Sequence, residues 1–84
     1  SSMITAQQIR AARAMLTWTQ EALADKAMVS LTALKRLEQG LRVYDSTADQ
    51  VRRALEEAGI IFISSGHVGV MIDAGRISGS GKQN

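Results

Sequence analysis

The chain has 84 residues, 45% of them hydrophobic and 21% charged, so it is long enough for one small globular domain and lacks the composition of a disordered chain. It contains no cysteine, which excludes disulfides and cysteine-ligated zinc, and its net charge of +2 is too small to identify a partner. No apolar run approaches the roughly 20 residues of a membrane-spanning helix, so we expect no membrane partner and a reducing, cytosolic location.

The first predicted helix begins after Thr5 and ends at about residue 17. Thr5 is followed three residues later by Gln8, which is the pattern of a capping box. One stripe of this helix is apolar at helical spacing, and Arg13 lies at its border. Ahead of it, we expect residues 1–2 to be a remnant of expression and Met3 to be the natural start.

Residues 19–40 form the segment around which the chain is organised, with two short amphipathic helices on either side of a break at residues 28–30. Thr19 and Ser30 stand where a side chain can cap each helix, and Gly40 stands where the second helix should end. A helix, a tight turn and a second helix make a helix-turn-helix, whose second helix can lie in the DNA major groove. This segment therefore predicts DNA binding.

The two faces of the second helix, residues 31–39, have different roles in this prediction. Leu34 and Leu37 face the core, because residues three apart lie on one side of a helix. The outer face is predicted to carry Leu31, Thr32, Lys35, Arg36 and Gln39. Lys35, Arg36 and the following Arg42 make this region locally basic, although a merely solvated helix face would have the same charges.

The remainder of the chain changes from helical to strand periodicity. Asp45 and Ser46 offer caps for a helix over about residues 47–58, which Gly59 should end. Residues 60–63 and 68–72 are rich in β-branched residues and predict an antiparallel hairpin, with its loop at residues 64–67. His67 in that loop is expected to be a surface residue rather than a metal ligand. Residues 74–84, rich in glycine and serine, are expected to form a flexible tail.

Over residues 4–58 the sequence resembles the phage-repressor and Cro-like helix-turn-helix family of bacterial transcriptional regulators, also called the xenobiotic-response-element (XRE) family. The resemblance rests on the spacing of Thr19, Gln20, Leu23, Ala24, Ala27, Val29, Ser30, Leu34, Leu37, Glu38 and Gly40, with Ile9, Arg13 and Leu16 in the first helix. It implies a mainly α, lambda-repressor-like domain of four helices over residues 4–59, here followed by the short β-hairpin at residues 60–73. It also implies a structural ion pair between Arg13 and Glu38, and a location in the bacterial cytosol or nucleoid.

The resemblance implies two groups of DNA contacts. Phosphate contacts, which set register without reading sequence, are expected from Thr19, Gln20, Ser30, Gln39 and Arg42. Base edges are expected to be read by Leu31, Thr32 and Arg36, with Lys35 placed for a phosphate or a base. The alternative for each of these residues is an exposed surface side chain.

One position departs from the family pattern. Met28 occupies the turn position that this family usually gives to glycine. If the backbone there has a positive φ, Met28 bears a strain of roughly 1 kcal/mol.

The hairpin suggests how many copies act together. An aliphatic β-hairpin with an unpaired edge can pair with a strand of a second chain, and regulators of this kind bind DNA as two-fold dimers. We therefore expect a homodimer interface at Ile61, Phe62, Ile63, Val68, Val70 and Ile72. The alternative is that the ribbon covers one side of the helical core.

These features favour a sequence-specific DNA-binding regulator, a repressor that binds a palindromic operator in double-stranded DNA as a dimer. One alternative is the antitoxin of a toxin–antitoxin pair, with a toxin as protein partner. Another is an interaction module that keeps the fold without binding DNA. No catalytic residues, cofactor or metal are expected, because the sequence has no catalytic carboxylate–histidine arrangement, no cysteine nucleophile and no phosphate-binding loop.

Overall fold

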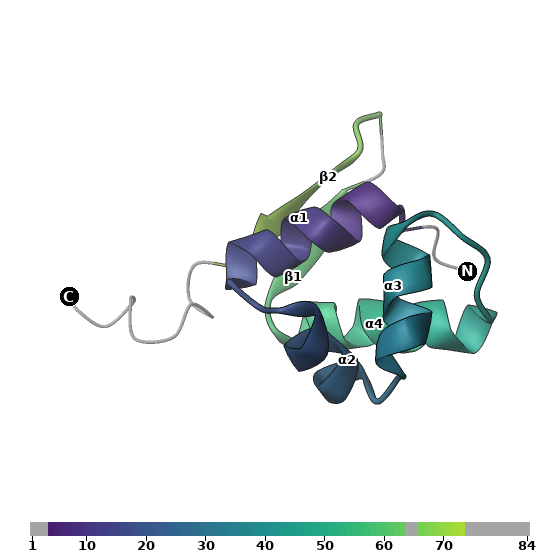
Figure 1. Cartoon of the computed structure of the whole chain (residues 1–84). Coiled ribbons are helices and arrows are strands. Elements are labelled where there is room, and N and C mark those ends of the chain that lie inside the picture. Colours follow the sequence, from purple (N-terminus) through teal and green to yellow (C-terminus); the bar gives the residue numbers. More distant parts are fainter. Residues whose placement is uncertain (1–3, 64–65, 74–84) are drawn as a thin grey trace.

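The computed structural model describes residues 4–63 and 66–73, so the predictions for residues 1–2 and 74–84 and for part of the hairpin loop lie outside the described residues. In the described part, four helices precede one antiparallel pair of strands (Figure 1). They are α1 (Ala6–Leu16), α2 (Gln20–Ala27), α3 (Leu31–Glu38), α4 (Asp45–Glu57), β1 (Ile60–Ile63) and β2 (Gly69–Ile72). This order confirms the predicted mainly α fold with a C-terminal hairpin. None of the described helices is long and apolar enough to cross a membrane.

Side-chain caps set the start of the first three helices. The Thr5 hydroxyl accepts from the Gln8 backbone N–H at 3.1 Å and the Gln8 side chain accepts from the Thr5 N–H at 2.9 Å, which completes the predicted capping box. Thr19 and Ser30 accept from N–H groups in the first turns of α2 and α3 at 3.0 Å. The sequence therefore specifies these three starts locally.

The start of α4 differs from the prediction. The helix begins at Asp45, and its N-cap is Tyr44, whose side chain makes no capping hydrogen bond. The expectation that Asp45 or Ser46 caps the helix is therefore wrong, because both residues lie inside the first turn. At that position the Asp45 carboxylate instead faces the positive end of the helix dipole.

All four helices are followed by a residue at positive φ, which after α4 is Gly59 (φ 104°), the predicted end of that helix. Gly40 (φ 80°) follows α3, where the Gly40 N–H donates to Leu37 at 3.1 Å and the Leu41 N–H donates to Arg36 at 2.9 Å. Met28 (φ 60°) and Thr17 (φ 56°) end α2 and α1 in the same conformation. The positive φ expected at Met28 is thus confirmed, whereas that of Thr17 was not anticipated. Both side chains have a Cβ in a region that favours glycine.

The core lies where the four helices meet. Its largest fully buried side chains come from all four helices: Ile9, Leu23, Leu34, Val51 and Leu55. Trp18, between α1 and α2, packs against this cluster, and the Lys26 ammonium lies 5.1 Å from its ring centroid.

The hairpin lies beside α1 and has two unlike faces (Figure 1). Phe62 pairs with Val70 in the ladder, and both pack against the helical core. Ile61 pairs with Met71, and these two side chains are 48% and 49% exposed. The strands therefore pair within one chain and cover one side of the core, while the opposite face of the ribbon stays open.

A buried glutamine fixes this ribbon to α1. Gln8 is only 3% exposed, and its amide nitrogen donates to the backbone oxygens of Ile63 at 3.1 Å and Gly69 at 2.9 Å. Together with the bond that its oxygen accepts from Thr5, these contacts use both amide hydrogens of Gln8. The residue that caps α1 therefore also holds the loop end of the hairpin, where Ile63 pairs with Gly69.

A buried carboxylate joins the first three helices. Glu38 is 3% exposed, and Arg13 donates from Nε and Nη2 to its two oxygens at 2.7 and 2.9 Å. Gln20 adds a third donor to Oε1 at 3.0 Å, and Arg10 donates to the Glu38 backbone oxygen. The implied Arg13–Glu38 ion pair is thus present with bidentate geometry, which is the geometry that a poorly solvated charge requires.

Replacing Met28 with glycine should stabilise the protein by roughly 0.5–1 kcal/mol, since the relief of left-handed strain exceeds the added entropy of the unfolded chain. The Met28 side chain is 82% exposed, so its removal loses little packing. Thermal unfolding should show a rise in Tm of about 4 °C. Met28→Ala keeps the Cβ and should leave Tm nearly unchanged; an equal gain in both variants would contradict strain as the cause.

Replacing Arg13 with methionine should destabilise the protein by about 3 kcal/mol, because the buried Glu38 carboxylate loses its bidentate partner. The double variant Arg13→Met/Glu38→Met should recover much of that loss, since it removes both charges. Urea unfolding of the single and double variants would give the coupling energy. Additive effects would show that the pair does not act as a unit.

Candidate nucleic-acid interface

The outward face of α3 is formed by polar side chains. Thr32, Lys35, Arg36 and the following Gln39 are exposed, as predicted from their spacing. Leu31 departs from that expectation, because it is half-buried and packs against the core. Its remaining surface is adjacent to Thr32, so Leu31 can contact a ligand only with part of its side chain.

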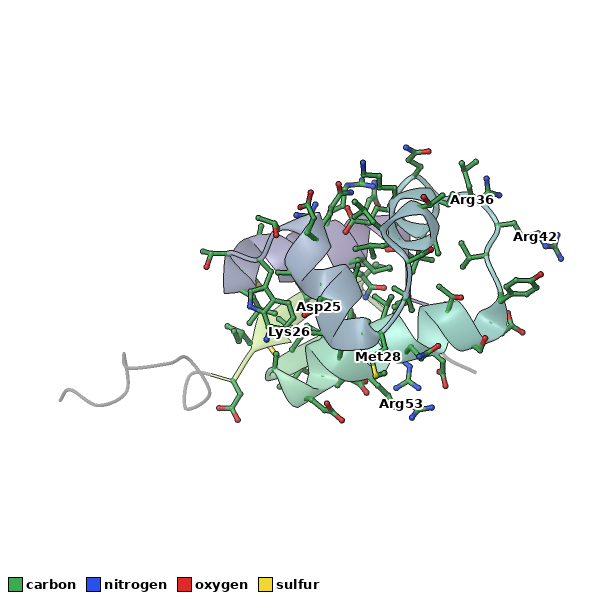
Figure 2. All side chains as sticks on the ribbon, turned by 60° about the horizontal axis from the view of Figure 1, so that its bottom comes forward. Asp25, Lys26, Met28, Arg36, Arg42 and Arg53 are labelled. Carbon is green, nitrogen blue, oxygen red and sulfur yellow. The ribbon has the colours of Figure 1, made fainter. Side chains whose placement is uncertain are left out.

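The cations beside this face have no ionic partners among the described residues. Lys35, Arg36 and Arg42 form no ion pair with another described residue, whereas Arg13 is paired with Glu38. Arg36 is held by a hydrogen bond from its Nη2 to the Arg42 backbone oxygen at 3.0 Å. Figure 2 shows Arg36 and Arg42 at one end of the molecule, at α3 and the connection that follows it. This end therefore presents positive charge that is available to an anion.

The arginines of α4 are paired with carboxylates of the same helix, although the buried Nε of Arg52 has no hydrogen-bond partner. Arg52 contacts Asp49 at 2.7 Å and Glu56 at 2.8 Å, and Arg53 contacts Asp49 at 3.4 Å. The hydrogen bond from Arg52 lowers the pKa of Asp49, and the same bond raises the pKa of Arg52. Arg53 lies on a different side of the molecule from Arg36 in Figure 2. The positive charge of α4 is therefore neutralised locally, away from the outward face of α3.

The predicted phosphate contacts lie at the starts of α2 and α3. Thr19 and Ser30 are exposed N-caps whose oxygens accept from the helix backbone, which leaves their hydroxyl hydrogens free to donate. Gln20 is half-buried, and its amide nitrogen already donates to Glu38. Only its second amide hydrogen is available to a phosphate. The DNA contact by Gln20 therefore stays a prediction, and it would use a single hydrogen-bond donor.

A shallow hollow adjoins the recognition helix, between α3, the connection that follows it and the first turn of α4. Its volume is about 490 Å³. Arg36 and Arg42 contribute cationic groups, while Ala33, Val43 and Tyr44 contribute apolar surface. Tyr44 is 83% exposed, so the rim of the hollow projects into solvent.

The residues predicted for a dimer interface fall into two groups, those packed against the core and those at least partly exposed. Phe62, Val70 and Ile72 pack against the core and are not free for a partner. Ile61 and Val68 are exposed, and Ile63 is half-buried. Met71, which the sequence prediction omitted, lies opposite Ile61 on the open face. The open face of the hairpin, defined here as Ile61, Ile63 and Met71, is therefore the surface that remains for association, and Val68 is exposed in the loop beside β2.

Several structural contacts had no clear sequence signal. The bonds of Gln8 to the hairpin and of Gln20 to Glu38 join residues 61 and 18 positions apart, and a lone glutamine does not indicate its partner. Met71 could have been found from strand alternation, because it is two residues from Gly69 and pairs with Ile61. Among the described residues, no group of three or more histidine, cysteine, aspartate or glutamate side chains could hold a metal, and His67 is exposed.

Comparison with known proteins agrees with the geometry. No curated protein matches the sequence. A protein-family model described as helix-turn-helix matches residues 9–60, more than half of the 84 residues. The matched region extends from α1 to the first residue of β1, and it contains the buried ion pair and the outward face of α3. The chain therefore belongs to the lambda-repressor-like, or XRE, helix-turn-helix family of DNA-binding regulators.

Proposed function

We propose that this protein is a transcriptional repressor that binds a palindromic operator as a homodimer. The observation that carries the proposal is the outward face of α3, where Thr32, Lys35 and Arg36 are exposed and the two cations lack internal ion pairs. A helix with this face fits the DNA major groove, which admits one α-helix.

Within the groove, Arg36 is the principal base-reading residue. A guanidinium can donate two hydrogen bonds to the O6 and N7 atoms of guanine. The bond from its Nη2 to the Arg42 backbone oxygen restricts the side chain in advance, so less conformational entropy is lost on binding. The Thr32 methyl group suits a thymine methyl, and the exposed ammonium of Lys35 suits a phosphate.

The phosphate contacts come from both sides of the recognition helix. Thr19 and Ser30 donate from their hydroxyls at the starts of α2 and α3, where the helix dipoles also favour an anion. Gln20 donates its second amide hydrogen to a phosphate. Gln39 and Arg42 contact the DNA backbone beyond the C-terminal end of α3. Because a domain bound in this way occupies the groove, it represses by excluding other proteins from the same DNA.

The dimer forms through the open face of the hairpin. Ile61 and Met71, which face each other across the strand pair, are each about half exposed, and Val68 in the adjoining loop is 64% exposed. A two-fold axis through this face would bury the same residues of both copies against each other. Two recognition helices would then reach successive major grooves, as a palindromic operator requires.

Replacing Arg36 with alanine should weaken binding to the selected operator by about 1–3 kcal/mol, because one bidentate base contact is lost. Binding to random-sequence duplex should change much less. The operator would first be selected from a random DNA pool, and both affinities would then be measured by fluorescence anisotropy at fixed salt.

Two further variants serve as controls for Arg36→Ala. Arg53→Ala removes a guanidinium from the neutralised face of α4 and should leave both affinities nearly unchanged. Arg42→Ala should weaken operator and random duplex alike and reduce the slope of log affinity against log salt by about 1. The absence of any enriched sequence in the pool, or equal losses on operator and random DNA for Arg36→Ala, would overturn base reading.

Replacing Ile61 with lysine should convert the dimer to a monomer at micromolar concentration, since a charge would be placed on the apolar interface. Light scattering after size exclusion measures the mass directly. Leu41→Lys is the matched control, because Leu41 is similarly exposed (47%) but lies outside the hairpin. A wild-type monomer at this concentration would contradict the hairpin dimer.

A further inference from the structure

We propose that the hollow beside α3 binds a small aromatic carboxylate and that this ligand competes with DNA for Arg36. The competition rests on the proposed function, whereas binding of the ligand does not. Among the lining residues of the hollow, Arg36 and Arg42 carry positive charge and none carries negative charge, so the charge complements an anion.

The size of the hollow suits a small organic molecule. Its volume of about 490 Å³ lies within the range of roughly 300–1,000 Å³ that is typical of ligand sites. Ala33, Val43 and Tyr44 supply apolar surface to its lining, and Tyr44 is largely exposed. An aromatic ring can lie against this apolar surface and bring its carboxylate to the guanidinium groups.

The apolar part of the lining distinguishes this site from a phosphate contact. A DNA phosphodiester can pair with Arg36 or Arg42, but it makes no favourable apolar contact with Ala33, Val43 and the Tyr44 ring. A ligand with both a ring and an acid uses all of these groups. We therefore assign the hollow to an aromatic acid rather than to an inorganic anion.

The fixed position of Arg36 supports recognition of a carboxylate. Its Nη2 donates to the Arg42 backbone oxygen at 3.0 Å, which ties the guanidinium to the connection that forms one wall of the hollow. The hydroxyl groups of Thr32 and Thr47 also line the site and can donate to a carboxylate. Since Arg36 cannot bind the ligand and a guanine edge in the same geometry, the ligand should release DNA.

The first test uses 2-naphthoate and the free protein. Titration followed by NMR should give saturable amide shifts at residues 30–47, with a dissociation constant of about 1 mM, as is usual for so small a ligand. Acetate has the charge without the ring, and 2-naphthalenemethanol has the ring without the charge. Neither should produce comparable shifts at the same concentration and ionic strength.

The second test measures displacement. At 10 mM 2-naphthoate and constant ionic strength, the apparent Kd for DNA should rise about tenfold, as simple competition requires. Tyr44→Ala should reduce this effect to less than twofold, whereas Tyr44→Phe, which keeps the ring, should retain it. Leu41→Ala is a control on the same connection that does not line the hollow. Because Tyr44 is largely exposed, Tyr44→Ala should fold normally, which circular dichroism would verify.

The proposal is overturned if 2-naphthoate gives no saturable shifts, if acetate is equally effective, if Tyr44→Ala remains fully sensitive, or if the ligand binds without releasing DNA. Failure of the proposed function looks different. If the protein bound no duplex at any salt concentration, DNA regulation would fail, while the shifts of the free protein would still decide whether the hollow binds an aromatic acid.

Discussion

The buried carboxylate of Glu38 determines which face of α3 reaches solvent. Because Glu38 is only 3% exposed, its charge requires partners, and Arg13 and Gln20 supply them from α1 and α2. A helix bound in this way at one residue and packed by Leu34 on the same side cannot rotate without leaving a charge unpaired. The opposite face, with Thr32 and Arg36, is thereby fixed outward. On the proposed function, the ion pair would act by orienting α3, and Gln20 links it directly to the phosphate contacts at the start of α2.

The same pairing explains why a nearly neutral protein can have a basic end. With a net charge of +2, little excess charge is available, yet three of its arginines are neutralised inside the fold or along α4. Among the described cations without an ionic partner, Arg10 donates to the Glu38 backbone oxygen and Lys26 lies over the Trp18 ring. The other three, Lys35, Arg36 and Arg42, lie together in or just after α3. The local field thus arises from which charges are paired rather than from how many there are.

Sequence reasoning succeeded where the determinants are local and failed where they are not. The starts of α1, α2 and α3 and the end of α3 follow from Thr5, Thr19, Ser30 and Gly40, each of which acts within a few residues. The first turn of α4 was placed too late, because a capping residue was assumed where the helix starts without one. The contacts of Gln8 and Gln20 depend on segments that only the tertiary fold brings near. For the candidate site, spacing predicted the exposed face of α3, but the partial burial of Leu31 depends on the core packed beside it.

The hairpin shows that folding and association use different residues. Its inner face, with Phe62 and Val70, is packed on the helices of the same chain, and Gln8 fixes its loop end. The core is therefore complete in one copy, so a dimer formed through the opposite face is not needed for folding. Such a dimer is free to depend on concentration and on DNA, because an operator that binds two copies raises their effective concentration. A modest apolar contact at Ile61 and Met71 would then be enough to make operator binding cooperative, which a regulator requires more than it requires a permanent dimer.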